Sequence, residues 1–95
     1  MWIGPDDHKI VGRQLRRYRL LRGVTQDELA LRLRKPQSFV SSYERGQRRV
    51  DFVEFVTIMR ALRMDPVEVG TMLLDHIDKE LDPPKPQSRG RKPAG

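Results

Sequence analysis

The sequence has 95 residues and contains no cysteine. This absence excludes disulfide bonds and thiolate metal sites, so the composition does not indicate a secreted, disulfide-stabilised domain. No apolar run approaches the roughly 18 residues that a membrane-spanning helix needs. The opening residues, MWIGPDDHK, have neither the basic start nor the apolar stretch of a secretory signal. We therefore expect a cytoplasmic protein that does not interact with membranes.

The sequence also shows no catalytic arrangement. The two histidines, His8 and His76, lie far apart in the chain without other metal ligands nearby, and no glycine-rich phosphate loop or nucleophile motif is visible. Ser41 and Ser42 have no base close to them in sequence. We therefore expect no catalytic residues, no bound metal and no cofactor, and a protein that is not an enzyme.

Basic residues are plentiful and unevenly distributed. The formal net charge is +6. Residues 9–49 contain twelve lysines and arginines against three acids, a net charge of +9, whereas residues 50–82 contain three against eight, a net charge of −5. This polarity suits a polyanion that meets the first half of the chain while the acidic half faces away or meets another protein. A merely solvated charged surface is the alternative interpretation.

Local motifs predict two short helices joined by a tight turn in the segment from Thr25 to Gly46. Thr25 and Glu28 have the spacing of a capping box, which begins a helix of about eight residues. Pro36 ends the preceding segment and favours the first position of a second helix, which Gly46 terminates. Short polar and amide side chains lie at the start of this second helix, where they could donate to and accept from base edges. This pattern indicates a helix-turn-helix.

Three further helices complete an all-α protein. The first spans residues 6–22, with an apolar stripe made by Val11, Leu15 and Tyr18. A fourth begins at the capping box of Asp51 and Glu54, and apolar residues spaced for core contact follow at Phe52, Phe55, Ile58, Met59 and Leu62. A fifth spans residues 66–81, with Asp65 as its cap and Pro66 at its first position. Its last apolar residues, Ile77 and Leu81, are candidates for a dimer contact, or else belong to an exposed helix end.

The chain therefore divides into three parts: an N-terminal arm at residues 1–7, a domain at residues 8–81 and a tail at residues 82–95. The tail, DPPKPQSRGRKPAG, lacks large apolar side chains, so we expect it to be disordered. Its RGRKP segment is similar to an AT-hook core, but Lys92 displaces the expected proline. A basic tail that adds non-specific DNA affinity is the better interpretation.

Three segments, VTQDELALRL, KPQSFVSSYERG and RALRMDP, resemble the XRE-type helix-turn-helix family of lambdoid phage repressors and Cro proteins. The resemblance covers residues 8–74 and implies a five-helix lambda-repressor-like bundle. It also implies that Gln26 and Arg45 contact phosphates, that Arg48 and Arg49 in the following loop contact phosphate or a minor groove, and that Arg19 and Glu44 form a structural ion pair. Four serine and glutamine positions and their aromatic neighbour would face or flank the bases: Gln37, Ser38, Phe39, Ser41 and Ser42.

The sequence departs from the family at Arg34 and Arg63, where the family pattern has glycine after the second and fourth helices. If both positions are left-handed, each arginine costs about 1 to 2 kcal/mol. At Arg34 a functional benefit would offset this strain, because a cation beside the DNA-facing turn would favour phosphate binding.

The resemblance implies a sequence-specific transcriptional regulator that binds the major groove of double-stranded DNA. It further implies a repressor that binds a palindromic operator as a homodimer. One alternative is an antitoxin that regulates its own operon and binds a protein partner through Ile77, Leu81 and the tail. A second alternative is a protein-interaction module that no longer binds DNA. The retained Gln37 and Ser38, with their flanking arginines, argue against the second alternative.

Overall fold

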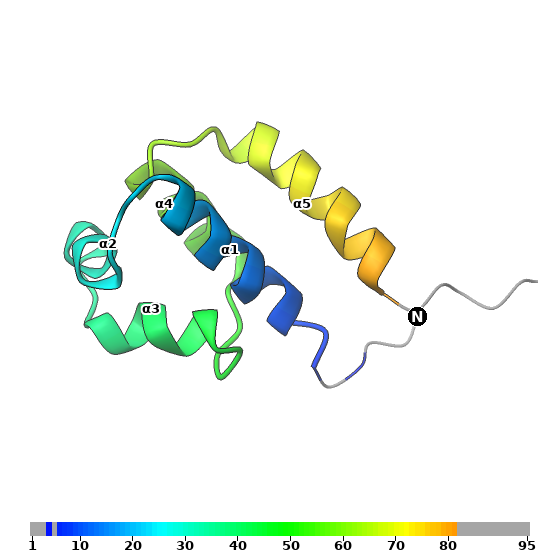
Figure 1. Ribbon diagram of the computed structural model, residues 1–95, viewed down its shortest axis with the longest axis horizontal. Coiled ribbons are helices and arrows are strands. Elements are labelled where there is room, and N and C mark those ends of the chain that lie inside the picture. The colour runs from blue at the N-terminus through cyan, green and yellow to red at the C-terminus, as the bar shows by residue number, and fades with distance from the viewer. Residues whose placement is uncertain (1–3, 5, 82–95) are drawn as a thin grey trace, which may run out of the picture.

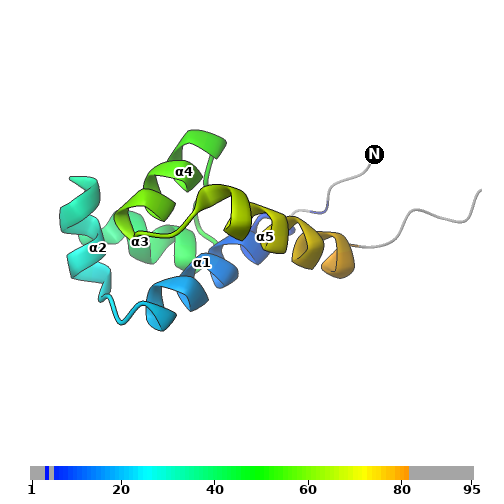
Figure 2. The same ribbon diagram turned by 90° about the horizontal axis from the view of Figure 1, so that it is seen from above.

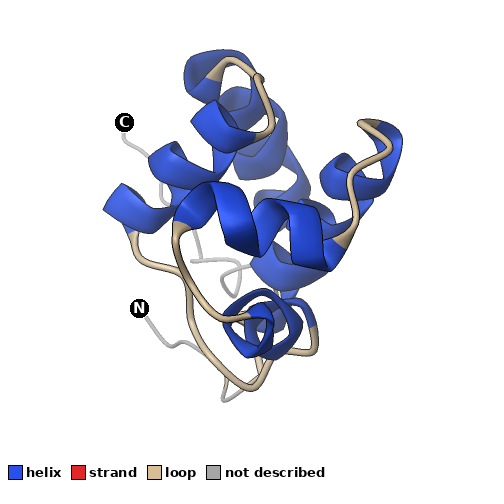
Figure 3. Cartoon of the chain, turned by 90° about the vertical axis from the view of Figure 1, so that its left-hand side faces the viewer, coloured by secondary structure: helices blue, strands red, loops and turns tan. Residues whose placement is uncertain are grey.

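The computed structural model describes residue 4 and residues 6–81, and within these residues all regular structure is helical (Figures 1 and 3). The five helices, in chain order, are α1 (Lys9–Leu21), α2 (Gln26–Leu33), α3 (Gln37–Glu44), α4 (Phe52–Ala61) and α5 (Pro66–Glu80). The predicted all-α, five-helix architecture is therefore confirmed. The predicted tail at residues 82–95 and most of the predicted arm lie outside the described residues.

Two capping boxes begin α2 and α4, as the sequence predicts. The Thr25 hydroxyl accepts a hydrogen bond from the Glu28 amide at 3.0 Å, and the Glu28 carboxylate accepts one from the Thr25 amide at 2.8 Å. Asp51 and Glu54 make the same two bonds at 2.7 and 2.9 Å. Each box satisfies amides that the first turn of a helix leaves without partners. The boxes thus fix where α2 and α4 begin.

The start of α1 differs from the sequence prediction. Residues 6–8 form a turn instead of the first turn of the helix, and α1 begins at Lys9. His8 occupies the N-cap without capping the helix through its side chain. Its Nε2 instead lies 2.7 Å from the carbonyl oxygen of Gly46, just beyond α3. This contact connects the beginning of α1 to the residue just beyond α3.

A left-handed arginine is the C-cap of α2, and another follows the C-cap of α4 by one residue. Arg34 and Arg63 each have φ of 57°, a region that residues with a Cβ rarely occupy. After each of them the chain bonds back to the helix: Lys35 donates its amide to the Ala30 carbonyl at 3.0 Å, and Met64 donates to the Met59 carbonyl at 2.8 Å. These bonds satisfy the terminal carbonyls and set the direction of the next segment.

Helix α1 lies in the middle of the bundle, between α3 on one side and α5 on the other, and it contacts both (Figures 1 and 2). Helix α2 packs against α3 and α4 at one end. All five helices contribute side chains to one core cluster, whose most enclosed members are Leu15, Leu29, Val40, Tyr43, Ile58, Met59, Leu62 and Val69. Among the described residues, no helix is long and apolar enough to cross a membrane. The bundle thus holds α2 and α3 along one edge, with α5 on the opposite side of α1.

The burial of two apolar side chains differs from the sequence prediction. Phe52 is predicted to reach the core, but its side chain is 81% exposed, and it stacks on Phe55 with ring centroids 6.5 Å apart. Only Phe55 enters the core. Ile77, predicted to lie beyond the core as a dimer contact or on an exposed helix end, is half-buried and packs against the core cluster. The dimer contact stays a prediction. One part of the exposed apolar surface therefore lies between α4 and α5, where Phe52, Val67 and Leu74 are exposed.

Candidate nucleic-acid interface

The recognition helix predicted from the sequence is α3, and its first turn faces solvent. Gln37 and Ser38 are exposed, and Ser41 and Ser42 are half-buried farther along the helix. Val40 and Tyr43 point into the core and anchor α3 from the opposite side. Pro36 occupies the N-cap in extended conformation, with φ of −67° and ψ of 155°, and α3 begins at Gln37, within the start predicted near residues 36 to 37. The side chains predicted to face bases thus lie on the outer surface of an anchored helix.

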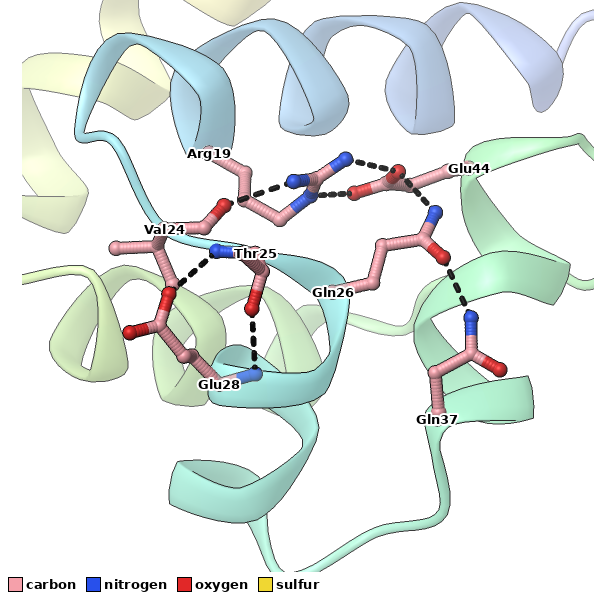
Figure 4. A network of polar contacts seen from close by, with 7 residues as sticks. All are labelled: Arg19, Val24, Thr25, Gln26, Glu28, Gln37 and Glu44. Carbon is pink, nitrogen blue, oxygen red and sulfur yellow. Dashed lines mark hydrogen bonds and ion pairs between the residues drawn. The ribbon is translucent and has the colours of Figure 1, made fainter.

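A buried ion pair holds the end of α3 against α1. Arg19 donates from Nε and Nη2 to the two carboxylate oxygens of Glu44, at 2.7 and 3.0 Å, and from Nη1 to the Val24 carbonyl at 2.8 Å (Figure 4). The hydrogen bond to Glu44 raises the pKa of Arg19 above its ordinary value. Both side chains are almost fully buried, so their charges depend on each other for compensation.

Hydrogen bonds continue from this ion pair to the molecular surface. Glu44 also accepts a bond from Gln26 Nε2 at 2.9 Å, and Gln26 Oε1 accepts one from Gln37 Nε2 at 2.6 Å (Figure 4). Gln37 is therefore oriented by a chain of polar contacts that begins in the core. Its amide retains one N–H and its carbonyl oxygen for other partners. That pair is the donor and acceptor with which glutamine binds adenine in the major groove.

The three predicted phosphate-binding arginines of this region differ in what they contact. Arg45, Arg48 and Arg49 are all exposed. Arg45 follows α3 directly, and its Nη2 lies 3.5 Å from the Gln47 side-chain oxygen, a long hydrogen bond. Arg48 is engaged by protein groups: it makes a two-bond ion pair with Glu54 at 2.7 and 3.0 Å. Arg45 and Arg49 are thus the freer cations at the edge of α3.

Phe39 is on α3, and its ring lies beside Arg48 of the loop that follows the helix. Its ring is half-buried and meets the Tyr43 ring edge-on, with centroids 5.6 Å apart. The Arg48 guanidinium lies 4.6 Å from the centre of the Phe39 ring, and the Lys35 ammonium lies 5.5 Å from it. Both distances fall within the range of cation–π attraction. Sequence reasoning did not identify Lys35, whose only signal was its place in the turn before α3.

Other arginines have structural partners. Arg22 donates to the Leu62 carbonyl at 3.0 Å, and Arg32 donates to the Ala61 carbonyl at 2.8 Å. These bonds satisfy carbonyls at the end of α4, where cations are also favoured by the helix dipole. Part of the positive charge of residues 9–49 therefore stabilises the bundle.

A second surface feature is an apolar groove between α4 and α5, with a volume of about 520 Å³. Phe52 and Val67 are more than 70% exposed beside it, and Leu74 is 69% exposed. Ile77 lines its inner part. The side chains that line the groove are almost all apolar.

Comparison with known proteins identifies a helix-turn-helix domain that includes α2 and α3. Residues 10–72 match the model of a helix-turn-helix domain family. The chain is 35% identical over 66 residues to an uncharacterized HTH-type transcriptional regulator, y4dJ, from Sinorhizobium fredii. That match covers 70% of this chain and 86% of the relative.

Solved structures show the same fold. An XRE-family like protein from Pseudomonas syringae has a TM-score of 0.67 at 38% identity, with 73% of this chain and 84% of that chain covered. The restriction-modification controller protein C.AhdI from Aeromonas hydrophila has a TM-score of 0.59 at 35% identity, with 70% of this chain and 98% of that chain covered. Both likenesses extend over most of the described bundle.

Proposed function

Because the chain belongs to the XRE-type helix-turn-helix family of DNA-binding transcriptional regulators, we propose that it is a repressor that binds a palindromic operator as a homodimer. The observation that carries this proposal is the orientation of Gln37 by the polar chain through Gln26, Glu44 and Arg19. A side chain fixed in this way loses little conformational freedom when it binds a base. Gln37 therefore supplies most of the sequence discrimination.

The other site residues have supporting roles in this proposal. Ser38 and Ser42 make weaker base contacts, flanked by Phe39 and Ser41, and Gln26, Arg45 and Arg49 hold phosphates on either side of α3. Phosphate contacts position the protein along the duplex, and base contacts select the sequence. Because one glutamine and short hydroxyl side chains give only moderate discrimination, the shape and deformability of the operator contribute as well.

We propose that the groove between α4 and α5 receives a second copy of the chain. A two-fold interface must be self-complementary, and this surface offers both a projection and a hollow. The exposed Phe52 ring forms part of the α4 wall of the groove, and Val67, Leu74 and Ile77 line the α5 side. The Phe52 ring of each copy would enter the groove of the other. Such a dimer would present two α3 helices to successive major grooves, about 34 Å apart.

Repression follows most simply from occlusion, since a dimer on an operator within a promoter blocks polymerase access. We place this activity in the cytoplasm. A protein partner at the C-terminal end of α5, as in an antitoxin, would still leave the DNA-binding function in place.

Selection from a randomised duplex library at two salt concentrations tests the proposal. We expect enrichment of a palindromic site whose half-sites lie about one helical turn apart. Sedimentation of the free protein tests the dimer, and Leu74→Asp is expected to shift it to monomer while its far-UV circular dichroism stays helical, because Leu74 is exposed in the single chain. Salt-dependent binding that enriches no sequence would contradict the repressor proposal.

A further inference from the structure

Four side chains from four different segments meet beside the recognition helix. Lys35 comes from the turn before α3, Phe39 from α3, Arg48 from the loop after it, and Glu54 from the first turn of α4. Lys35 and Arg48 both lie against the Phe39 ring, and Arg48 makes its ion pair with Glu54. We call these residues the Arg48 cluster. It places two cations and one carboxylate at the edge of the predicted DNA surface.

The hydrogen bonds of the Arg48 guanidinium leave one of its edges free. A guanidinium has five N–H donors. Nη1 donates to a Glu54 oxygen at 3.0 Å and to the Arg49 carbonyl at 2.9 Å, and Nη2 donates to the other Glu54 oxygen at 2.7 Å. Among the described residues, the Nε–H and the second N–H of Nη2 have no acceptor. This remaining edge has the geometry that binds a phosphate with two hydrogen bonds.

We propose that Glu54 competes with DNA phosphate for Arg48 and thereby limits the affinity of the protein for DNA. This inference rests on the proposed function, since it concerns how strongly the same surface binds. A phosphate at the free edge of Arg48 meets a guanidinium whose charge is already compensated by Glu54. It also lies close to the Glu54 carboxylate, which repels it. Binding therefore recovers little of the energy that an unpaired arginine would give.

The exposure of the ion pair makes this competition effective. The Arg48 side chain is 41% exposed and the Glu54 side chain is 21% exposed. Ion pairs at such positions are weak because water screens them, so a polyanion can displace one partner. A deeply buried pair, such as Arg19 and Glu44, would not exchange in this way.

Phe39 is the positioning residue of the Arg48 cluster. Its ring lies against the guanidinium and limits the directions in which Arg48 can extend. The same ring lies within reach of Lys35, so both cations remain beside α3. This arrangement assigns Phe39 a role in phosphate binding, where the sequence suggested only that it flanks the bases.

Glu54 has a second role that allows a clean test. Its carboxylate accepts the Asp51 amide and closes the capping box of α4. Glutamine at this position can also close such a box. Glu54→Gln therefore removes the charge and weakens the hold on Arg48 while it preserves the start of α4. Asp27→Asn is the matched control, because Asp27 is an exposed carboxylate in the first turn of α2.

The experiment is a double-mutant cycle of Glu54→Gln and Arg48→Ala, measured by titration against a mixed-sequence duplex at several salt concentrations. We expect Glu54→Gln to raise affinity roughly threefold to tenfold at low salt and to steepen the salt dependence by up to about 0.9 in the log–log slope. The gain should vanish in the Arg48→Ala background. Asp27→Asn should give a smaller gain that is the same with and without Arg48. Melting temperatures verify that each variant is folded.

Two results would overturn the inference alone while wild-type binding stands. An equal gain from Glu54→Gln with and without Arg48 would mean that Glu54 acts only as a nearby negative charge. A loss of affinity in a folded Glu54→Gln protein would mean that Glu54 orients Arg48 for phosphate. Failure of the wild type to bind any duplex would overturn the proposed function and this inference with it.

Discussion

Gly12 of α1 lies directly against the backbone of Tyr43 in α3. A Cβ atom at Gly12 would lie 2.0 Å from the Tyr43 carbonyl oxygen and 3.1 Å from its carbonyl carbon. Both neighbours are backbone atoms, so no side-chain rotation can make room. The close approach of α1 and α3, which positions the recognition helix, therefore requires glycine at this residue.

Gly12→Ala should lower the free energy of unfolding by about 2 to 4 kcal/mol, because α1 and α3 must separate to admit the methyl group. Gly70→Ala is the matched control in α5. Its added methyl would meet only the Phe55 ring at 3.8 Å, an ordinary contact, so improved helix propensity should stabilise the protein by up to about 1 kcal/mol. Urea titration of both variants measures the difference. Equal effects of the two substitutions would contradict the close approach.

Glycine should stabilise the protein at the two left-handed arginines. Arg34→Gly and Arg63→Gly relieve a strain of about 1 to 2 kcal/mol, partly offset by the greater freedom of glycine in the unfolded chain. We expect a net gain of roughly 0.5 to 1 kcal/mol at each position, measured as a higher melting temperature. Arg60→Gly, within α4, should instead destabilise the protein by about 1 kcal/mol. Unchanged or lower melting temperatures for both Arg34→Gly and Arg63→Gly would refute the strain argument.

Removing one partner of the Arg19–Glu44 ion pair should destabilise the protein more than replacing both partners with apolar side chains. Arg19→Met leaves the Glu44 carboxylate buried without its partner, and we expect a loss of about 3 to 5 kcal/mol. The double variant Arg19→Met with Glu44→Leu removes both charges and should recover a large part of that loss. Denaturant unfolding of the single and double variants measures the recovery. A double variant less stable than Arg19→Met alone would contradict this account.

Acid should weaken the starts of α2 and α4. The hydrogen bond from the Thr25 amide lowers the pKa of Glu28, and the hydrogen bond from Arg48 lowers the pKa of Glu54, both from an ordinary value of 4.5. A lowered pKa contributes stability that is complete above pH 4.5 and is lost as the pH falls through the folded-state value. Melting temperatures between pH 6 and 2 should therefore fall less steeply for Glu28→Gln and Glu54→Gln than for the wild type. Parallel curves would show that neither carboxylate contributes.

The features that sequence predicts best depend on residues close together in the chain. Thr25 with Glu28, and Asp51 with Glu54, act within one helical turn, so their spacing alone locates the beginnings of α2 and α4. The left-handed arginines follow from the resemblance, because glycine usually occupies their positions. Such local patterns also account for the turn that precedes α3.

The features that sequence misses depend on how segments meet. The contact of Gln26 with Gln37 requires the angle between α2 and α3, and the ion pair of Arg48 with Glu54 requires the path of the loop after α3. Phe52 has the spacing of a core residue but lies at the edge of the face that α4 buries. Helical periodicity cannot distinguish such an edge from the centre of the face.

The most direct measurement of the central claim compares Gln37→Ala and Arg45→Ala with the wild type, on the enriched operator and on an unrelated duplex at one salt concentration. Loss of a base contact with two hydrogen bonds should weaken operator binding about tenfold to a hundredfold and leave binding to the unrelated duplex nearly unchanged. Arg45→Ala should weaken binding to both duplexes alike, since a phosphate contact does not depend on sequence. Equal losses on both duplexes for Gln37→Ala would contradict the assignment of α3 as the element that reads DNA sequence.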